Sequence, residues 1–563
     1  MSHSIRQTQL PCSAQRLLCY LIISAGMFAS SGSGQGLPIE SAPALDQSNN
    51  IRNYLTRVAQ DLTHRSLSEI HTLDQWQERR GPRRAQFLEM MGLADVPVDG
   101  PRPELNVRIT GTIQRPGYRI EKLYYESLPQ LYVPANLYIP EGLSKPAPAI
   151  LYVCGHSRTQ KVSYQAHARR FAELGFVCLI FETIQWGEVQ GEHWGCYARG
   201  WFHWYSRGYN PGGVELWNAL RGLDLLCKRP EVNPNKLGVT GISGGGTQTW
   251  YVAAADARIK AAATVCGTTT VKSHIHQQTI DGHCDCMMPI NTYQQDFMDI
   301  GALIAPRPLM IASAQRDGLN AIEAVREVYH RTKAVYEFYG QADNLVLVET
   351  PGGHSYHPIS RTRIFSFFLK HLMGKELPAS QIADIDASPS AQLSADALRV
   401  YTPDAPPGDR TKTIQDSFIK LAEAPLLSSV SAMDTQREKV RAFLQERTFG
   451  AFPQDPAPLD TRWEFRDLDG AKHGMHIYSF VTEQGLRLRV DLRWRQDPHA
   501  PHPVMLVLRS PHEKRWASEG AVSGLSQAWN IAYLECRGLG ATGWAPHTQW
   551  PISRAAAWTG RTV

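Results

Sequence analysis

Short, nearly continuous apolar segments alternate with helical patterns along the middle of the chain, and this alternation constrains the fold more than any other feature. We expect strands over residues 149–154, 176–181, 237–240, 261–265, 308–313 and 345–349. Helices are expected over residues 164–174, 213–228, 247–255 and 321–339. Strands that are apolar on both faces occur in parallel sheets that helices cover on both sides. The pattern therefore predicts an α/β protein with a doubly wound, mostly parallel sheet.

Two smaller patterns precede this region. Apolar residues at helical spacing predict two helices in an N-terminal preface, residues 37–104; the two stripes are Ile51, Leu55, Val58 and Leu62, and Trp76, Phe87, Leu88 and Met91. Residues 122–127 and 133–139 then resemble a β-hairpin. We place the main domain at residues 105–378, followed at 379–397 by a linker rich in Ala, Ser, Asp and Pro.

The last region, residues 398–563, repeats the order of elements in the main domain. Residues 477–494 correspond to the hairpin, and residues 503–508 and 531–534 to the first two buried strands, with a helix expected over about 517–529 between them. The copy ends at Val563, before the point where the main domain has its sharpest turn. We therefore predict an incomplete second half-domain of the same class, whose open edge and apolar face pack on the main domain or on another chain.

The first 31 residues have the three parts of a signal peptide. Arg6 and Arg16 precede an apolar run over residues 17–29, and small residues follow it. The run is too short to span a bilayer comfortably as a permanent helix, although an uncleaved anchor is the alternative. We expect a leader at residues 1–31, a secreted or periplasmic protein, and no stable membrane insertion after cleavage.

Composition narrows the partners further. The net charge of +5 is dilute over 563 residues and no basic stripe accompanies it, which argues against a nucleic-acid partner. Cys154 and Cys178 lie within predicted buried strands and should be free thiols. The better disulfide candidates are Cys196, Cys284 and Cys286. Their pairing and the oligomeric state are left open.

The sharpest local signal is Gly-x-Ser-x-Gly around Ser243, directly after one predicted strand and before a predicted helix. A turn of this kind holds the serine in strained backbone and aims a helix N-terminus at the oxygen that acquires negative charge. We predict that Ser243 is a nucleophile. The alternative is a glycine-rich turn needed only for packing.

A serine nucleophile needs a base, and the base needs an orienting acid. Asp317 follows the strand at 308–313 and His354 follows the strand at 345–349, in the order Ser, Asp, His that parallel-sheet hydrolases use. His357 is a rival base, but it lies beyond the glycine loop, before Pro358. Asp343 is a weaker rival acid, because it lies in a turn before its strand.

An oxyanion hole should combine the backbone N–H of Gly244 with one N–H from the loop that follows the strand at 149–154. In that loop both His156 and Ser157 remain candidates.

With these residues placed, a resemblance can be stated. The segments that carry it are CGHS at 154–157, GISGGGTQTWYVAAADARIKAA at 241–262, TIDGHCDCMMPINTY at 279–293, IAPRPLMIASAQRD at 304–317 and ETPGGHSYH at 349–357. They resemble the bacterial acetyl xylan esterase-like group of α/β-hydrolases, whose core is also similar to that of prolyl oligopeptidases and dienelactone hydrolases. The likeness extends over about residues 105–377. It implies a secreted serine carboxylesterase that removes small acyl groups, such as acetyl, from plant or algal polysaccharide through Ser243, Asp317 and His354.

Two alternatives remain. A prolyl-oligopeptidase-like peptidase would carry a large propeller or β-domain before its hydrolase domain, whereas the preface here is short and helical. A non-catalytic polysaccharide-binding protein could also be built on a hydrolase fold. The last region has no matching nucleophile, so we expect it to contribute no hydrolysis and a fragment of residues 37–385 to remain active.

Two side-chain groups are less decisive. The first is a loop dense in potential ligands, namely His274, His276, Asp281, His283, Cys284, Asp285 and Cys286. Its spacing is not a usual zinc pattern, so we expect a hydrogen-bonded loop, no metal and no cofactor. The second group, in the insertion after the strand at 176–181, includes Trp186, Trp194 and Trp201. These rings either stack on sugars of the substrate or form the small core of a lid.

Overall fold

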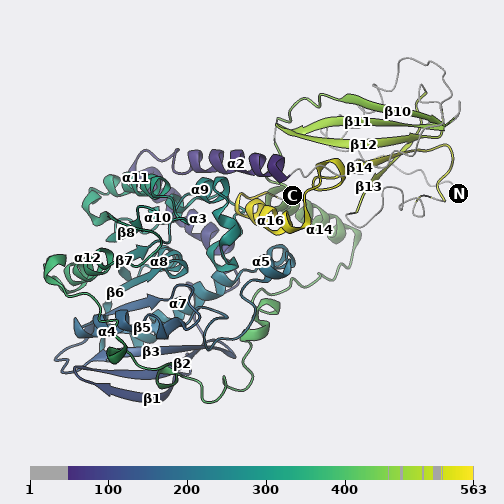
Figure 1. Ribbon diagram of the computed structural model, residues 1–563. Coiled ribbons are helices and arrows are strands. Elements are labelled where there is room, and N and C mark those ends of the chain that lie inside the picture. Colours follow the sequence, from purple (N-terminus) through teal and green to yellow (C-terminus); the bar gives the residue numbers. More distant parts are fainter. Residues whose placement is uncertain are drawn as a thin grey trace. The chain divides into compact units, whose positions relative to one another are not determined.

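The computed structural model describes residues 48–453, 455–469, 473–496, 500–510, 522 and 524–561 (Figure 1). These residues divide into two compact units. The five-stranded unit consists of the described residues up to Tyr54 together with Phe452–Gln549. The nine-stranded unit consists of Leu55–Ala451 together with the described residues from Trp550 onward. The predicted leader, residues 1–31, lies outside the described residues.

One sheet forms the centre of the nine-stranded unit, in the spatial order β1-β2-β3-β5-β4-β6-β7-β8-β9. The strands are β1 (Arg108–Arg115), β2 (Tyr118–Leu128), β3 (Leu131–Pro140), β4 (Ala147–Val153), β5 (Val177–Phe181), β6 (Val232–Ile242), β7 (Ile259–Val265), β8 (Leu309–Ala314) and β9 (Leu345–Thr350). Neighbours from β1 to β5 are antiparallel, and those from β5 to β9 are parallel. The expected mostly parallel sheet and its hairpin are confirmed.

Helices cover this sheet on both faces. They include α4 (Gln165–Glu173), α7 (Pro211–Lys228), α8 (Gly244–Ala255), α9 (Val271–His276), α10 (Phe297–Ala302), α11 (Ile322–Phe338) and α12 (Pro358–Phe368). On one face, Phe171 of α4 packs 5.1 Å from Phe365 of α12, ring centroid to ring centroid, over the buried side chain of Ile150. On the other face, α7 lies so close to the sheet that a Cβ on Gly222 would meet Leu151. Cover on both faces explains why β4 is apolar throughout.

The preface forms two helices, α2 (Ser48–Arg65) and α3 (Leu73–Met90). The side chains of both predicted stripes are buried in the structure. In the nine-stranded unit these helices attach to the start of α10. Thr63 donates a hydrogen bond to Asp296, and Arg83 forms an ion pair with Asp299, each with a separation of 2.5 Å. From Leu55 onward, the preface is therefore part of the unit that carries the main sheet.

The segment predicted as a linker, residues 379–397, packs on the same unit. Its only regular elements are two 3₁₀ turns and the beginning of the short helix α13 (Ala395–Leu398). Ile382 is nevertheless buried in the core, and Gln165 of α4 binds the backbone of Leu393 in both directions. The compact unit continues to Ala451 and includes α14 (Val430–Phe443). This division differs from the predicted boundary at residue 397, because buried side chains within an otherwise polar stretch hold it to the core.

The five-stranded unit contains a smaller sheet in the order β10-β11-β12-β14-β13. Its strands are β10 (Arg462–Asp469), β11 (His473–Glu483), β12 (Leu486–Trp494), β13 (Val504–Leu508) and β14 (Asn530–Glu535). Only β13 and β14 are parallel; the other neighbours are antiparallel. Strand order and directions thus repeat those of β1-β2-β3-β5-β4. Most of the helix expected at 517–529 lies outside the described residues.

The last helix, α16 (Gln549–Trp558), belongs to the nine-stranded unit from Trp550 onward. Arg554 is buried there and donates from Nη2 to the backbone oxygen of Cys284 at 2.9 Å. Asn291 binds the backbone oxygen of Trp558 at 2.8 Å. We expected residues 398–563 to pack on the main domain or on another chain, and this last helix does pack on the main domain. Of the helices described, none has the length and apolar character needed to cross a membrane.

Candidate active site

Ser243 occupies the sharp turn between β6 and α8. Its backbone has φ 59° and ψ −123°, a conformation that costs a non-glycine residue about 1–3 kcal/mol. The turn can close because its neighbours lack side chains: a Cβ on Gly241 or on Gly245 would lie 2.2 Å from the backbone oxygen of Val153. If the turn served packing alone, glycine would be the favoured residue at position 243 too. A serine at this strained position is the pattern expected of a nucleophile turn.

Asp317 and His354 are joined by a hydrogen bond of 2.9 Å between Oδ2 and Nδ1. The Asp317 side chain is fully buried, whereas that of His354 is 27% exposed. Burial opposes ionisation of Asp317, but hydrogen bonds from His354, Leu319 and Asn320 outweigh it and lower the pKa of the carboxyl. The acid is therefore ionised, and it orients the ring so that Nε2 of His354 is left for proton transfer.

The loops that carry these residues meet at one edge of the sheet, because β6, β8 and β9 run parallel. The N–H of Ser243 donates to the oxygen of Val265 at the end of β7, at 2.9 Å. The next residue, Cys266, contacts the backbone oxygen of Ser355 through its sulfur at 3.7 Å. The backbone of Arg316 binds that of Gly352 at 2.9 Å. This chain of contacts connects the nucleophile turn to the histidine loop and the histidine loop to the acid loop.

The two rival residues have other positions. His357 caps the N-terminus of α12, where its Nδ1 accepts the N–H of Ile359 at 3.1 Å. Asp343 lies in the 3₁₀ turn Ala342–Asn344, which precedes β9 and is therefore at the opposite end of that strand from His354. The structure thus brings Asp317 and His354 together and neither rival with them.

The loop after β4 contacts the nucleophile turn directly. A Cβ on Gly155 would lie 2.6 Å from the oxygen of Ile242, and a Cβ on Gly244 would lie 2.2 Å from the ring of His156. Gly244 is the first residue of α8, where an N–H has no partner within the helix. The amides of His156 and Ser157 both remain candidates for the second donor of an oxyanion hole.

The His156 ring also belongs to a compact cluster with His193, Cys284 and Cys286. The sequence interpretation treated the two cysteines as part of a hydrogen-bonded loop or as disulfide candidates, and it did not connect them with the two histidines. Burial opposes ionisation of Cys284, but the hydrogen bond with Cys286 and the charge of His156 outweigh it and lower the pKa of that thiol. Burial and the neighbouring Cys284 raise the pKa of the Cys286 thiol.

The remaining cysteines within the described residues are also free. The predicted buried thiols Cys154 and Cys178 are confirmed. Cys196, a predicted disulfide candidate, instead contacts the backbone oxygen of Trp201 at 3.3 Å.

The three tryptophans predicted to contact substrate fall into two groups. Trp186 and Trp194 are half-buried, 4.9 Å apart between ring centroids, and Trp186 lies 5.6 Å from the ring of His156. Trp201 packs at 5.7 Å on Trp204, which is fully buried. The first two rings therefore border the loop after β4, and the third belongs to the small core of the insertion.

The sequence interpretation missed one residue that supports the acid. Asn320 donates its backbone N–H to Oδ1 of Asp317 at 3.2 Å and its side-chain amide to the backbone oxygen of Cys266 at 3.0 Å. An asparagine three residues after a loop aspartate is a common turn pattern, and this spacing was the available signal.

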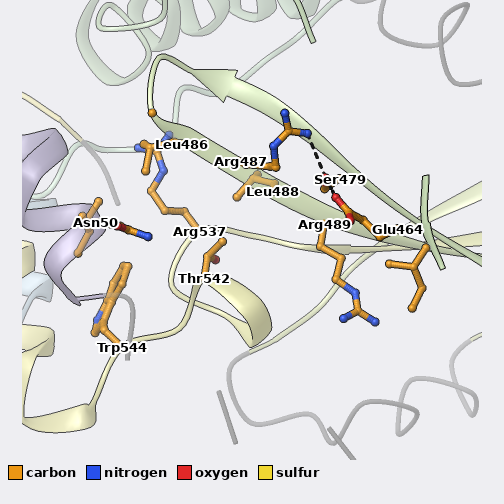
Figure 2. Close-up of a pocket in the computed structure, with 13 residues that line it drawn as sticks. Asn50, Glu464, Ser479, Leu486, Arg487, Leu488, Arg489, Arg537, Thr542 and Trp544 are labelled. Atoms are coloured by element: carbon orange, nitrogen blue, oxygen red, sulfur yellow. Dashed lines mark hydrogen bonds between the residues drawn. The ribbon is translucent and has the colours of Figure 1, made fainter. Parts of the chain in front are cut away.

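The five-stranded unit has a cavity of about 450 Å³, shown in Figure 2. Three arginines line it, and each is paired: Arg487 donates to Ser479, Arg489 to Asp491 and Arg537 to Glu483. The lining residues that the structure describes include no histidine and no cysteine. We find no nucleophile and base in this cavity comparable to Ser243 and His354.

Known proteins that are similar to this chain include one named as a hydrolase and several named as esterases. No family model matches the chain. The chain is 25% identical over 306 residues to the protein named "Putative hydrolase YtaP" from Bacillus subtilis (strain 168), an alignment that covers 52% of this chain and 100% of that protein. Among solved structures, it is similar to "Methylesterase BT1017", with a TM-score of 0.49, 20% identity, and coverage of 72% of this chain and 85% of the other. It is also similar to a glucuronoyl esterase from Solibacter usitatus, with a TM-score of 0.42, 17% identity, and coverage of 53% and 93%.

Three features of the nine-stranded unit now agree. They are the strand order, the strained serine at the turn between β6 and α8, and the Asp317–His354 pair at the same edge of the sheet. The relative that is named as a hydrolase aligns with 52% of this chain over the whole of its own length. The nine-stranded unit therefore has the fold of an α/β-hydrolase, and the chain is similar to a protein that is named as a hydrolase.

Proposed function

We propose that the nine-stranded unit is a serine carboxylesterase that removes small acyl groups, acetyl in particular, from polysaccharide. The observation that carries this proposal is Ser243 at φ 59°, on the same edge of the sheet as the Asp317–His354 hydrogen bond of 2.9 Å. Strained serine backbone beside a buried acid and a partly exposed histidine is the arrangement that acyl transfer requires.

In the first half of the reaction, Oγ of Ser243 attacks the ester carbonyl carbon while Nε2 of His354 takes the hydroxyl proton. The oxyanion is stabilised by the N–H of Gly244 and by that of His156 or Ser157. His354 then gives its proton to the sugar oxygen, which leaves as an alcohol. In the second half, a water molecule attacks the acyl carbon while Nε2 of His354 takes one of the water protons. The bond to Oγ of Ser243 then breaks, His354 returns the proton to Oγ, and the acyl group leaves as a carboxylic acid.

The surroundings of the site support a carbohydrate substrate. Trp186 and Trp194 are half-buried beside the His156 loop, so part of each ring remains accessible. Sugar rings stack on exposed aromatic faces because both surfaces are apolar. Trp201 is not part of this substrate surface in the proposal, because it packs on the buried Trp204.

We also propose that the protein works outside the cytoplasm. This proposal depends on the three-part pattern of residues 1–31 alone. Expression in a bacterial host followed by fractionation and N-terminal sequencing tests it. Mature protein in the periplasm or medium that begins near residue 32 supports it, and full-length protein retained in the cytoplasm would contradict it.

The central experiment is acetate release from a panel of acetylated glycans, measured beside methyl-ester glucuronates and a proline-containing peptide. Acetate release that Ser243→Ala abolishes supports the proposal. Release of methanol alone would move the substrate to the methyl ester, and cleavage of the peptide alone would favour a peptidase. Glycan binding without any turnover would favour a binding protein.

A further inference from the structure

Four potential metal ligands converge beside the nucleophile turn, from three separate loops. His156 follows β4, His193 lies in the insertion after β5, and Cys284 and Cys286 lie in the segment between α9 and α10. The two Nε2 atoms and the two Sγ atoms all lie within 4.8 Å of one another. Nε2 of His156 is 3.1 Å from Nε2 of His193, 3.0 Å from Sγ of Cys284 and 3.2 Å from Sγ of Cys286.

The orientation of the rings fits coordination rather than a simple hydrogen-bonded network. Nδ1 of His193 is 2.9 Å from the backbone oxygen of Ile184, so it carries the proton and leaves the Nε2 lone pair directed at the cluster. A backbone carbonyl on the outer nitrogen is the usual partner of a metal-bound histidine. His156 likewise directs Nε2, and not Nδ1, at both sulfurs.

The backbone around the two cysteines is held from outside the cluster. Asp285, between them, accepts the N–H of Cys196 at 2.9 Å, and Arg554 of α16 donates to the oxygen of Cys284 at 2.9 Å. Both the Asp285 and the Arg554 side chains are fully buried. The two sulfur ligands are therefore placed before any ion binds, which lowers the cost of assembling a site.

We propose that His156, His193, Cys284 and Cys286 bind one Zn²⁺ ion. Two thiolates and two imidazoles are a common zinc ligand set, and four protein ligands complete a tetrahedral site with no position for water or substrate. The cysteines bind as thiolates and the histidines as neutral imidazoles, so binding releases protons and the two thiolate charges balance that of the ion. The ion has a structural role and joins the three loops.

The site also bears on the proposed esterase mechanism. A Cβ placed on Gly244 would lie 2.2 Å from the His156 ring. A zinc ion that fixes this ring also fixes the loop whose amide is a candidate oxyanion donor. This consequence depends on the proposed function, whereas the zinc site does not.

A reactive cysteine is a poorer explanation of the cluster. Cys284 is 6% exposed and Cys286 is 1% exposed, so neither sulfur is accessible to a substrate. A Cys284–Cys286 disulfide is the other alternative, because their sulfurs are 2.8 Å apart. A disulfide would remove both sulfur ligands, and the two explanations exclude each other.

The first test measures metal in the full purified chain after dialysis against metal-free buffer. Elemental analysis should find one zinc per chain, and intact mass under denaturing conditions should show both cysteines reduced. Less than about 0.2 zinc per chain after exposure to zinc would overturn the proposal. A mass lower by two hydrogens, located by peptide mapping to Cys284–Cys286, would overturn it, as would copper or iron in place of zinc.

Replacement by Co²⁺ gives a readout independent of both activity and mutation. Tetrahedral Cys₂His₂ ligation should produce strong visible bands and sulfur-to-cobalt charge transfer in the near ultraviolet. Weak bands typical of six oxygen or nitrogen ligands would contradict the assignment.

Variants locate the ion. Cys284→Ser and His193→Gln should each lower zinc content at least about fivefold, whereas the control Cys227→Ser, a thiol on α7 outside the cluster, should retain one zinc. Equal zinc in all three would overturn the site. Full zinc content without fluorophosphonate labelling of Ser243 would refute the esterase proposal alone.

Discussion

The two sheets of this protein begin in the same way and end differently. Strands β10-β11-β12-β14-β13 repeat the order and directions of β1-β2-β3-β5-β4. After this common part the larger sheet continues with β6 to β9, which carry Ser243, Asp317 and His354 at their ends. The smaller sheet has no described strand beyond β13. The comparison teaches that the candidate nucleophile, acid and base all lie on the strands that only the larger sheet has, while the shared strands carry the loops that border them.

Equivalent residues extend the comparison to side chains. Glu182 follows β5 and pairs with Lys161, and Glu535 ends β14 and pairs with Arg509. A glycine lies five residues after each glutamate, Gly187 and Gly540, and both have positive φ. A Cβ on Gly187 would lie 2.5 Å from the Glu182 carboxyl, and a Cβ on Gly540 would lie 2.1 Å from the Glu535 carboxyl.

The largest expected effect distinguishes the two sheets by chemistry. Ser243→Ala should lower ester turnover at least about 10⁴-fold without unfolding the protein, because the hydroxyl is the proposed nucleophile. Ser526→Ala, at an exposed serine of the five-stranded unit, should leave the rate unchanged. Steady-state kinetics and mass spectrometry after fluorophosphonate treatment measure both, and an adduct on any other residue contradicts the assignment.

The same experiment can test the base. His354→Ala should be nearly as damaging as Ser243→Ala, and the double variant scarcely worse, because the residues of a triad act as a unit. Losses that add would point to a different base.

The second expected effect compares Leu151 of β4 with its equivalent, Leu506 of β13. Leu151 is fully buried between strands and under α7, whereas Leu506 is 51% exposed on an edge strand. Leu151→Lys should prevent folding of the nine-stranded unit, since a buried unpaired charge costs several kcal/mol. Leu506→Lys should change the free energy of unfolding by less than about 0.5 kcal/mol and should reduce self-association. Circular dichroism melts measure the stability of both variants, and light scattering measures self-association. Equal destabilisation by Leu151→Lys and Leu506→Lys would refute the edge position of β13.

The third effect concerns α16, which is missing from the fragment of residues 37–385. We now expect that fragment to be less stable than the full chain. That fragment lacks Arg554, whose side chain is fully buried beside Asp285. Arg554→Ala should lower the free energy of unfolding by about 3 kcal/mol, because the buried carboxylate loses its cation. Denaturant unfolding measures this loss, with the exposed Arg437→Ala as the control. Full activity in the fragment would show that α16 is dispensable.

The smallest effect compares the two glutamates. The Lys161–Glu182 pair is 2% exposed on both sides, and Lys161 keeps a second ion pair with Glu188, so Glu182→Gln should cost about 2 kcal/mol. The Arg509–Glu535 pair is 11% and 7% exposed, and Glu535→Gln should cost only about 1 kcal/mol. Hydrogen exchange followed by mass spectrometry assigns each loss to its own unit. A reversed order would mean that the two positions are not equivalent.

Much of the fold could be predicted because local signals agreed with the tertiary structure. The apolar runs at 149–154 and 176–181 became β4 and β5 within two residues at each end, and the stripe that includes Leu55 and Leu62 became the buried face of α2. The segment 379–397 was harder, because its composition is that of a linker. Single apolar residues such as Ile382 hold it to the core, and isolated apolar residues carry no periodic signal.

The sequence by itself determined the sheet, the strained turn at Ser243 and the chain order of the candidate nucleophile, acid and base. Strand periodicity, glycine-rich turns and positions at strand ends are local properties, so they can be read along the chain. Only the tertiary structure decided that His156 and His193 meet Cys284 and Cys286, and that Arg554 lies beneath them. These residues are as far as 398 positions apart along the chain (554 − 156), and their proximity follows from how the sheet and its helices pack.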